Sequence, residues 1–197
     1  MLAAIATVAG LWSGTVSILV GTILAYAVRP PIFLGLDFLP ALVNVSIVAL
    51  VVSKRLRIAQ ALYLLILLAF VVSPYSLLFG YYYIPYTWLH IVALAVMLSP
   101  VGAKIPDWLI RKGVRQLEAI GILAFFGTMA QHLTGGLLYE LTAGYLGGIS
   151  PQNFVQFWRI IFWLYPIERI LIVAGSTLIA TTLYRSLKKA PYTARIL

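Results

Sequence analysis

Long apolar runs separated by short polar segments dominate the chain. A bilayer core of about 30 Å needs roughly 20 apolar residues of helix, and six runs meet or approach this length. The predicted membrane spans are residues 2–28, 36–53, 58–73, 84–103, 117–139 and 160–184. We therefore expect an all-α, polytopic membrane helix bundle of about six transmembrane helices, formed as a single transmembrane domain over residues 1–197.

Turn-forming residues separate these runs. Arg29-Pro30-Pro31 ends the first run, Ser73-Pro74 ends the third, and a glycine-rich stretch over residues 144–151 follows the fifth. The first run has no basic segment before it and is longer than the apolar region of a secretory signal. We therefore expect it to be retained as the first span.

The basic residues predict the orientation of the bundle. Lysine and arginine near helix ends stay on the cytoplasmic side, and eleven of the fourteen follow the second, fourth or sixth run. They are Lys54, Arg55, Arg57, Lys104, Arg111, Lys112, Arg115, Arg185, Lys188, Lys189 and Arg195. With an even number of spans, both termini are expected in the cytoplasm and the protein in the cell membrane. The exceptions Arg29, Arg159 and Arg169 belong to the opposite face or to the membrane itself.

Composition excludes several classes of protein. The chain is 62% hydrophobic and 10% charged, with a mean hydropathy of +1.01, whereas soluble domains have roughly 45–50% apolar and about 25% charged residues. The net charge of +9 lies in short bursts between apolar runs rather than on one face that would bind nucleic acid. The absence of cysteine excludes disulfides and thiolate chemistry. No metal or phosphate-binding motif is present, so we expect no cofactor, no bound metal and no enzymatic activity.

Two segments allow more than one interpretation. Residues 104–116 are predicted to form an amphipathic helix at the cytoplasmic interface, or else a linker anchored by Trp108. In the first span, small residues recur at four-residue spacing, which allows helices to approach closely. One stripe is Ala6, Gly10 and Gly14, and the other is Ser13, Ser17, Gly21 and Ala25. These stripes fit packing within the bundle or docking of another subunit.

The fifth and sixth runs carry ionisable residues at membrane depth. We expect His132 and Glu140, eight residues apart, to share one helical face, although His132 would also be stable as a neutral group bonded to a carbonyl or hydroxyl. Pro166 suits a first helical turn, so the sixth span should start near it, after an interfacial segment over residues 154–164. Glu168 and Arg169 are neighbours that point about 100° apart, so we expect that they cannot simply satisfy each other and that each has another partner on a neighbouring helix or in a ligand. A purely structural ion-pair role is the alternative.

Aromatic residues gather at the non-cytoplasmic side of the predicted bundle. They are Tyr75, Tyr81, Tyr82, Tyr83, Tyr86, Trp88, Trp158, Trp163 and Tyr165. Most are expected to be interfacial anchors. A few would roof a pocket that opens outward near the ionisable residues.

Three segments carry a resemblance to a known family. They are Leu36-Asp37-Phe38-Leu39-Pro40, residues 128–145 with His132, Gly135 and Gly136, and Tyr165-Pro166-Ile167-Glu168-Arg169 followed by Leu187-Lys188-Lys189. In these segments, in length and in topology, the chain resembles the substrate-binding S components of energy-coupling factor (ECF) transporters. These are small six-span prokaryotic proteins that bind vitamins or similar trace nutrients.

The resemblance implies a substrate pocket at the outer face and a set of contacts. The implied ligand-binding residues are Asp37, Tyr82, His90, His132, Glu140, Glu168 and Arg169. Ala6, Gly10 and Gly14 would dock a transmembrane coupling subunit, which is driven by two ATPase subunits supplied in trans. The family commonly has two alanines four residues apart at this place, and here the second is a glycine.

The leading hypothesis is therefore a substrate-capture subunit of a nutrient importer, with a small-molecule substrate and energising partner subunits. The alternative is a non-catalytic structural or accessory subunit of a larger membrane complex, in which the ionisable residues tie helices together. A membrane enzyme that uses Glu140 and His132 as acid and base is a third hypothesis. No nucleophile or metal constellation in the sequence supports it.

Overall fold

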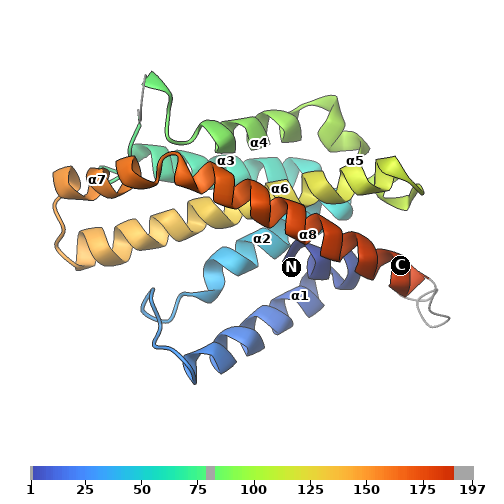
Figure 1. Cartoon of the computed structure of the whole chain (residues 1–197), viewed down its shortest axis with the longest axis horizontal. Coiled ribbons are helices and arrows are strands. Elements are labelled where there is room, and N and C mark those ends of the chain that lie inside the picture. Colours follow the sequence, from blue (N-terminus) through green and yellow to red (C-terminus); the bar gives the residue numbers. More distant parts are fainter. Residues whose placement is uncertain (1, 79–82, 189–197) are drawn as a thin grey trace.

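The computed structural model describes residues 2–78 and 83–188, and within these ranges the secondary structure is helical (Figure 1). Tyr82, Lys189 and Arg195 lie outside the described residues, as does Tyr81. The elements are α1 (Leu2–Tyr26), α2 (Phe38–Val52), α3 (Leu56–Val72), α4 (Trp88–Leu98), α5 (Pro100–Ile110), α6 (Val114–Tyr139), the π-helix η2 (Glu140–Leu146), α7 (Pro151–Ile161) and α8 (Leu164–Lys188). The expected all-α class is confirmed.

Several helices are apolar enough to cross a membrane. Val114–Leu146 and Leu164–Ser186, of 33 and 23 residues, reach the required length, and α4 with α5 forms a third apolar unit that is bent by 72°. Gly10–Tyr26, α2 and α3 are shorter apolar helices. Large apolar side chains such as Leu171 and Leu178 are exposed on α8, as expected for a surface that faces lipid. The described helices therefore support association with a membrane.

The break between α4 and α5 corrects the fourth predicted span. Residues 84–103 do not form one continuous helix, because α4 ends at Leu98 and Ser99 is extended. Pro100 has no N–H and its ring would clash with a preceding helical turn, so it starts a new helix instead. The Ser99 Oγ accepts a hydrogen bond from the Val101 N–H at 3.2 Å. The helix expected over residues 104–116 is only partly correct, because α5 begins earlier, at Pro100, and ends at Ile110, while residues 114–116 already belong to α6.

The segment before the last helix agrees with the sequence pattern. A separate helix, α7, precedes α8, and Ser150 caps it by accepting a hydrogen bond from the Asn153 N–H at 3.4 Å. Phe154 and Trp158 are buried on one face of α7, while its polar residues face outward. Pro166 lies in the first turn of α8, which begins at Leu164.

Helix α6 is the central element of the bundle, since it contacts α1, α2, α3, α4, α5 and α8. Small residues on α6 make this possible. A Cβ on Gly127 would clash with the Asn44 side chain of α2, and a Cβ on Gly136 would come within 2.9 Å of the Phe70 ring of α3. Glycine at these two positions lets α2 and α3 approach α6 closely.

The two stripes of small residues in α1 have different surroundings. Ala6 and Gly14 are buried, and a Cβ on Gly14 would come within 2.7 Å of the Val45 Cγ1 on α2. Gly10 has a φ of +75° and interrupts the helix. Gly21 is exposed, like Ser13 and Ser17 of the second stripe. Ala6 and Gly14 of the first stripe therefore pack inside the bundle, whereas Ser13, Ser17 and Gly21 of the second stripe face outward.

The basic segments gather at one end of the bundle. The α2–α3 connection, the α5–α6 connection and the C-terminal end of α8 lie together in Figure 1. Lys54 Nζ lies 3.4 Å from the Asp107 Oδ1, and the Arg185 Nε donates to the Gln116 Oε1 at 3.3 Å. The α1–α2 connection and α7 lie at the opposite end (Figure 1). The shared end that the charge pattern predicts is thus present for the described segments.

The packing of α1 on α2 can be tested with two glycines of the same helix. We expect Gly14→Ala to destabilise the protein by about 1–3 kcal/mol, because the new methyl group overlaps a stiff valine side chain. Gly21→Ala is the matched control, since nothing lies within 4 Å of its added Cβ. It should be neutral or stabilising by up to about 1 kcal/mol. Thermal unfolding in detergent measures both, and equal midpoints for the two variants would contradict the described contact.

Candidate functional site

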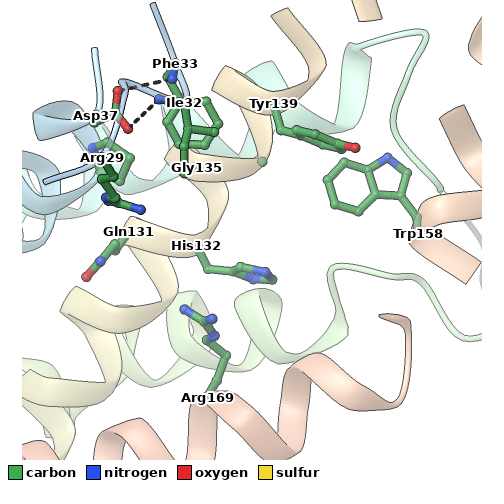
Figure 2. Close-up of a pocket in the computed structure, with 12 residues that line it drawn as sticks. Arg29, Ile32, Phe33, Asp37, Gln131, His132, Gly135, Tyr139, Trp158 and Arg169 are labelled. Atoms are coloured by element: carbon green, nitrogen blue, oxygen red, sulfur yellow. Dashed lines mark hydrogen bonds between the residues drawn. The ribbon is translucent and has the colours of Figure 1, made fainter. Parts of the chain in front are cut away.

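A cavity of about 370 Å³ lies at the end of the bundle opposite the basic segments. Its volume is within the range of about 300–1,000 Å³ that is usual for small-molecule sites. The α1–α2 connection, α6, α7 and α8 all contribute to it (Figure 2). The lining residues are Arg29, Ile32, Phe33, Asp37, Pro40, Gln131, His132, Gly135, Gly136, Tyr139, Trp158 and Arg169.

Asp37 holds the α1–α2 connection against the cavity. Its carboxylate accepts hydrogen bonds from the Ile32 N–H at 3.0 Å, the Phe33 N–H at 3.1 Å and the Tyr26 hydroxyl at 3.4 Å. Partial burial opposes ionisation of Asp37, but the two backbone hydrogen bonds and the tyrosine hydroxyl outweigh it and hold the pKa below its usual value. Both carboxylate oxygens are thus committed to the loop (Figure 2), and Asp37 shapes the cavity wall.

One face of α6 forms the floor of the cavity. Gln131, His132, Gly135 and Tyr139 lie on adjacent turns of this helix, and Gly135 leaves room beside Pro40. The Gln131 Oε1 accepts a hydrogen bond from the Asn44 Nδ2 of α2 at 2.8 Å. The amide of Gln131 is therefore fixed in place, with its NH₂ group free of that contact.

His132 belongs to a stack of rings beneath the cavity. Its Nδ1 lies 3.0 Å from the Nε2 of the fully buried His90 on α4, so one ring donates a hydrogen bond and the other accepts it. The two rings stack at a centroid distance of 5.1 Å, and the Tyr165 ring stacks on both. The Tyr165 hydroxyl donates to the Tyr86 carbonyl oxygen. This stack ties α4, α6 and α8 together under the cavity.

Arg169 enters the cavity from α8. Its guanidinium points toward His132 (Figure 2), and its side chain is 15% exposed. Its Nη2 lies 2.7 Å from the Oε1 of Glu168, which is 53% exposed. The expectation that these neighbours could not satisfy each other is therefore wrong, because long side chains bend across the angle that separates their Cβ atoms. The buried Nε of Arg169 still has no hydrogen-bond partner among the described residues.

Tyr139 and Trp158 form an aromatic wall on the other side of the cavity (Figure 2). Their ring centroids are 6.2 Å apart with an interplanar angle of 83°. The Trp158 Nε1 donates to the Tyr75 carbonyl oxygen at 2.8 Å, and the indole also packs edge-on against Phe70. These contacts fix the orientation of the tryptophan ring.

The structure brings together some of the residues that the resemblance implies. Asp37, His132 and Arg169 line the cavity, and His90 supports it through His132. Tyr82 lies outside the described residues, and Glu168 reaches the site only through Arg169. Glu140 is buried but does not line the cavity. Eight residues at 100° each rotate it about 80° from His132, so the expectation of a shared face was too coarse.

Several lining residues were not expected to bind a ligand. Arg29 stood out in the sequence only as an exception to the charge pattern, yet it reaches the cavity and points toward Gln131 (Figure 2). Tyr139 and Gln131 belong to a stripe of α6 next to His132, which was a usable signal. Trp158 was one of many aromatic residues at this end. Only the fold distinguishes it from an interfacial anchor.

The site offers binding groups rather than a metal centre. In residues 2–78 and 83–188, no group of three or more His, Cys, Asp or Glu side chains is placed to hold a metal ion. The cavity instead presents two guanidinium groups, a carboxylate, an amide, an imidazole and three aromatic rings. Such a set can bind and orient a small polar molecule.

The role of Asp37 in shaping the site predicts a loss of stability on its removal. We expect Asp37→Ala to lower the free energy of unfolding by on the order of 1 kcal/mol, since backbone donors lose a charged acceptor at a partly exposed site. Asp107→Ala is the control. Asp107 pairs with Lys54 at an exposed position, so its removal should change stability little.

The stability lost in Asp37→Ala should depend on pH. Because the folded-state pKa of Asp37 lies below the usual 3.8, the ionised carboxylate stabilises the fold above that pH. This contribution is lost as the pH falls through the lowered pKa. The difference in unfolding midpoint between the native chain and Asp37→Ala should therefore be present near neutral pH and shrink in strongly acidic buffer. A difference that grows on acidification would show that the loop hydrogen bonds are not made.

Comparison with protein-family models, with curated proteins and with solved structures found no match to this chain. The resemblance to S components accordingly rests on the residues named above. The function must be argued from the geometry of the cavity and from the charges around it.

Proposed function

We propose that this chain is the membrane-embedded substrate-capture subunit of a nutrient importer of the S-component type. It binds a vitamin-like small molecule in the cavity and has no catalytic activity of its own. A transmembrane coupling subunit and ATPase subunits supply the energy in trans. The observation that carries the proposal is the cavity itself, in which polar groups from the α1–α2 connection, α6 and α8 converge opposite an aromatic wall.

The site is more consistent with ligand binding than with structural reinforcement. Groups that only tie helices together are expected to satisfy each other, since unpaired polar groups are costly in an apolar environment. Here the buried Arg169 Nε has no partner among the described residues, and no ion pair joins Arg29 to Asp37, the acidic residue of the same loop. Purely structural interiors are close-packed, whereas the space beside Gly135 is open.

The proposal includes six membrane crossings with both termini in the cytoplasm. α1, α2, α3, the bent pair α4 and α5, α6 and α8 would make these crossings, the shorter ones by local thinning of the bilayer. The gathering of basic segments at one end of the bundle supports this orientation. The cavity then opens toward the outside of the cell.

An accessory subunit of a larger complex is the second candidate, and one observation favours it. The stripe of Ser13, Ser17 and Gly21 is exposed on α1, as a face that docks another helix would be. The ionisable residues argue against this candidate. Glu168 and Arg169 pair within α8 rather than between helices, whereas His90 and His132 join α4 to α6.

A ligand screen tests the capture function. Thermal unfolding of the detergent-solubilised protein is measured against a panel of vitamins, their precursors and nucleobases. A ligand that binds only the folded state raises the midpoint in a saturable way. Gly135→Leu should abolish the shift, because its side chain extends into the cavity, where the nearest atom to a new Cβ is the Pro40 Cγ at 4.0 Å.

Gly21→Leu is the matched control for this screen, since its side chain would extend into open space on α1. The control should respond to the ligand like the native chain. If a stable, folded protein shows no shift with any compound, the capture function is wrong and the accessory role becomes the better explanation. A shift that survives Gly135→Leu would place the ligand elsewhere.

Single cysteines test the orientation, because the native chain has none. Ser53→Cys lies in the α2–α3 connection and Gln152→Cys lies on α7, both at exposed positions. On intact cells, a membrane-impermeant maleimide should label Gln152→Cys and leave Ser53→Cys unlabelled. Both should react after lysis. The reverse pattern would show that the basic end faces outward.

A further inference from the structure

We propose that the ligand of this cavity is an organic anion that carries a planar ring. Its carboxylate or phosphate group binds between Arg29, Gln131 and Arg169, and its ring lies against Tyr139 and Trp158. This inference rests on the proposed capture function and specifies the substrate class.

The distribution of acidic residues carries the charge argument. The chain has five, and all lie within the described residues. Asp107 and Glu118 form ion pairs at the basic end, and Glu140 does not line the cavity. Glu168 binds one terminal nitrogen of Arg169 from the exposed side. Only Asp37 remains at the cavity.

Asp37 does not neutralise the cavity arginines through a direct contact. Its two oxygens accept the hydrogen bonds from the Ile32 and Phe33 N–H groups that order the α1–α2 connection. Among the residues that line the cavity, Asp37 is the acidic one, and it forms no ion pair with Arg29 or Arg169. Glu168 already pairs with Arg169, so Arg169 lacks only an acceptor for its buried Nε, whereas the exposed Arg29 lacks a counter-charge in direct contact among the described residues. An anionic ligand would supply both.

The unused hydrogen-bonding groups of the cavity are donors, so they favour an anionic ligand just as the positive charges do. Asn44 occupies the carbonyl oxygen of Gln131, which leaves the Gln131 NH₂ as a donor. The Arg169 Nε is a second unused donor, and an arginine can contact two oxygens of a carboxylate or phosphate with its planar fork. Arg29 extends toward Gln131 from the facing loop (Figure 2). Donors from three segments thus surround one side of the cavity and would bind acceptor oxygens.

The opposite side of the cavity selects for a ring. The Trp158 Nε1 is already bonded to the Tyr75 carbonyl, so the indole offers apolar ring surface to a ligand. Tyr139 meets it nearly at a right angle, which leaves an aromatic corner. With about 370 Å³ available, a single or fused ring with a short acidic arm fits better than an inorganic ion or a long chain.

Matched acid and neutral compounds test this inference. The probes are benzoate with benzamide, nicotinate with nicotinamide, and phenyl phosphate with phenol, each titrated at millimolar concentrations in thermal unfolding and calorimetry. At least one acid should raise the midpoint in a saturable way, while its neutral twin does not. The carboxylate and phosphate members show which acidic group the site prefers.

Three arginine variants complete the experiment. Arg29→Gln and Arg169→Gln should each weaken binding of the acid at least about tenfold, the expected loss when a charged hydrogen bond of about 1.5 kcal/mol is removed. Arg159→Gln, on α7 and outside this cavity, should bind like the native chain. Arg29 is exposed, so its variant should keep the unfolding midpoint of the free protein and reports on binding alone.

The outcomes separate this inference from the capture function. If the neutral twins bind as well as the acids, or if Arg29→Gln and Arg169→Gln bind unchanged, the inference is overturned and the capture function stands. The inference is also overturned, and the capture function stands, if no acid binds but an uncharged vitamin raises the midpoint and Gly135→Leu abolishes that shift. If no acid, neutral twin or vitamin binds the folded protein, both are overturned.

Discussion

The close contact between α2 and α6 is the constraint on which both the bundle and the cavity depend. At Gly127 there is no room for a side chain, because Asn44 of α2 lies directly against the α6 backbone. One helical turn later the same asparagine donates its hydrogen bond to Gln131, on the cavity floor. The α2 helix also begins directly after Asp37, which orders the facing wall. A larger residue at position 127 would therefore shift the helix that holds two sides of the site.

Most of the helices could be predicted from the sequence, because in an apolar chain the polar and proline breaks mark where helices end. The errors occurred where local geometry or distant contacts decide. Ser99-Pro100 is a recognisable helix break, but apolar residues continue on both sides of it. Residues 84–103 were therefore predicted as one span. The pairing of Glu168 with Arg169 depends on side-chain length rather than on helical angle. Arg29 lies near Gln131 although the two are about a hundred residues apart in the sequence, and no local sequence pattern could predict this proximity.

The candidate site was predicted in part, for a physical reason. Ionisable residues in apolar runs stand out, so His132 and Arg169 were found, and Asp37 followed from the resemblance. Whether such a residue faces a cavity or is used up by its neighbours depends on tertiary contacts. Asp37 is used by its own loop, and His90 is buried beneath His132. Glycine at 135 and the fixed ring of Trp158 create the space, and neither bears a charge that would reveal it.

The bundle is closely packed between the cavity and the basic end. Beneath His132, the α6 residues Met129, Phe126 and Leu123 are fully buried and fill the bundle toward the basic end. Interiors packed in this way have no continuous space for a small molecule to pass. A ligand held between Arg29 and Arg169 is thus accessible from one end of the bundle only. Delivery to the other end requires that helices separate or that the whole bundle reorients, and in the proposed importer the coupling subunit would drive that change.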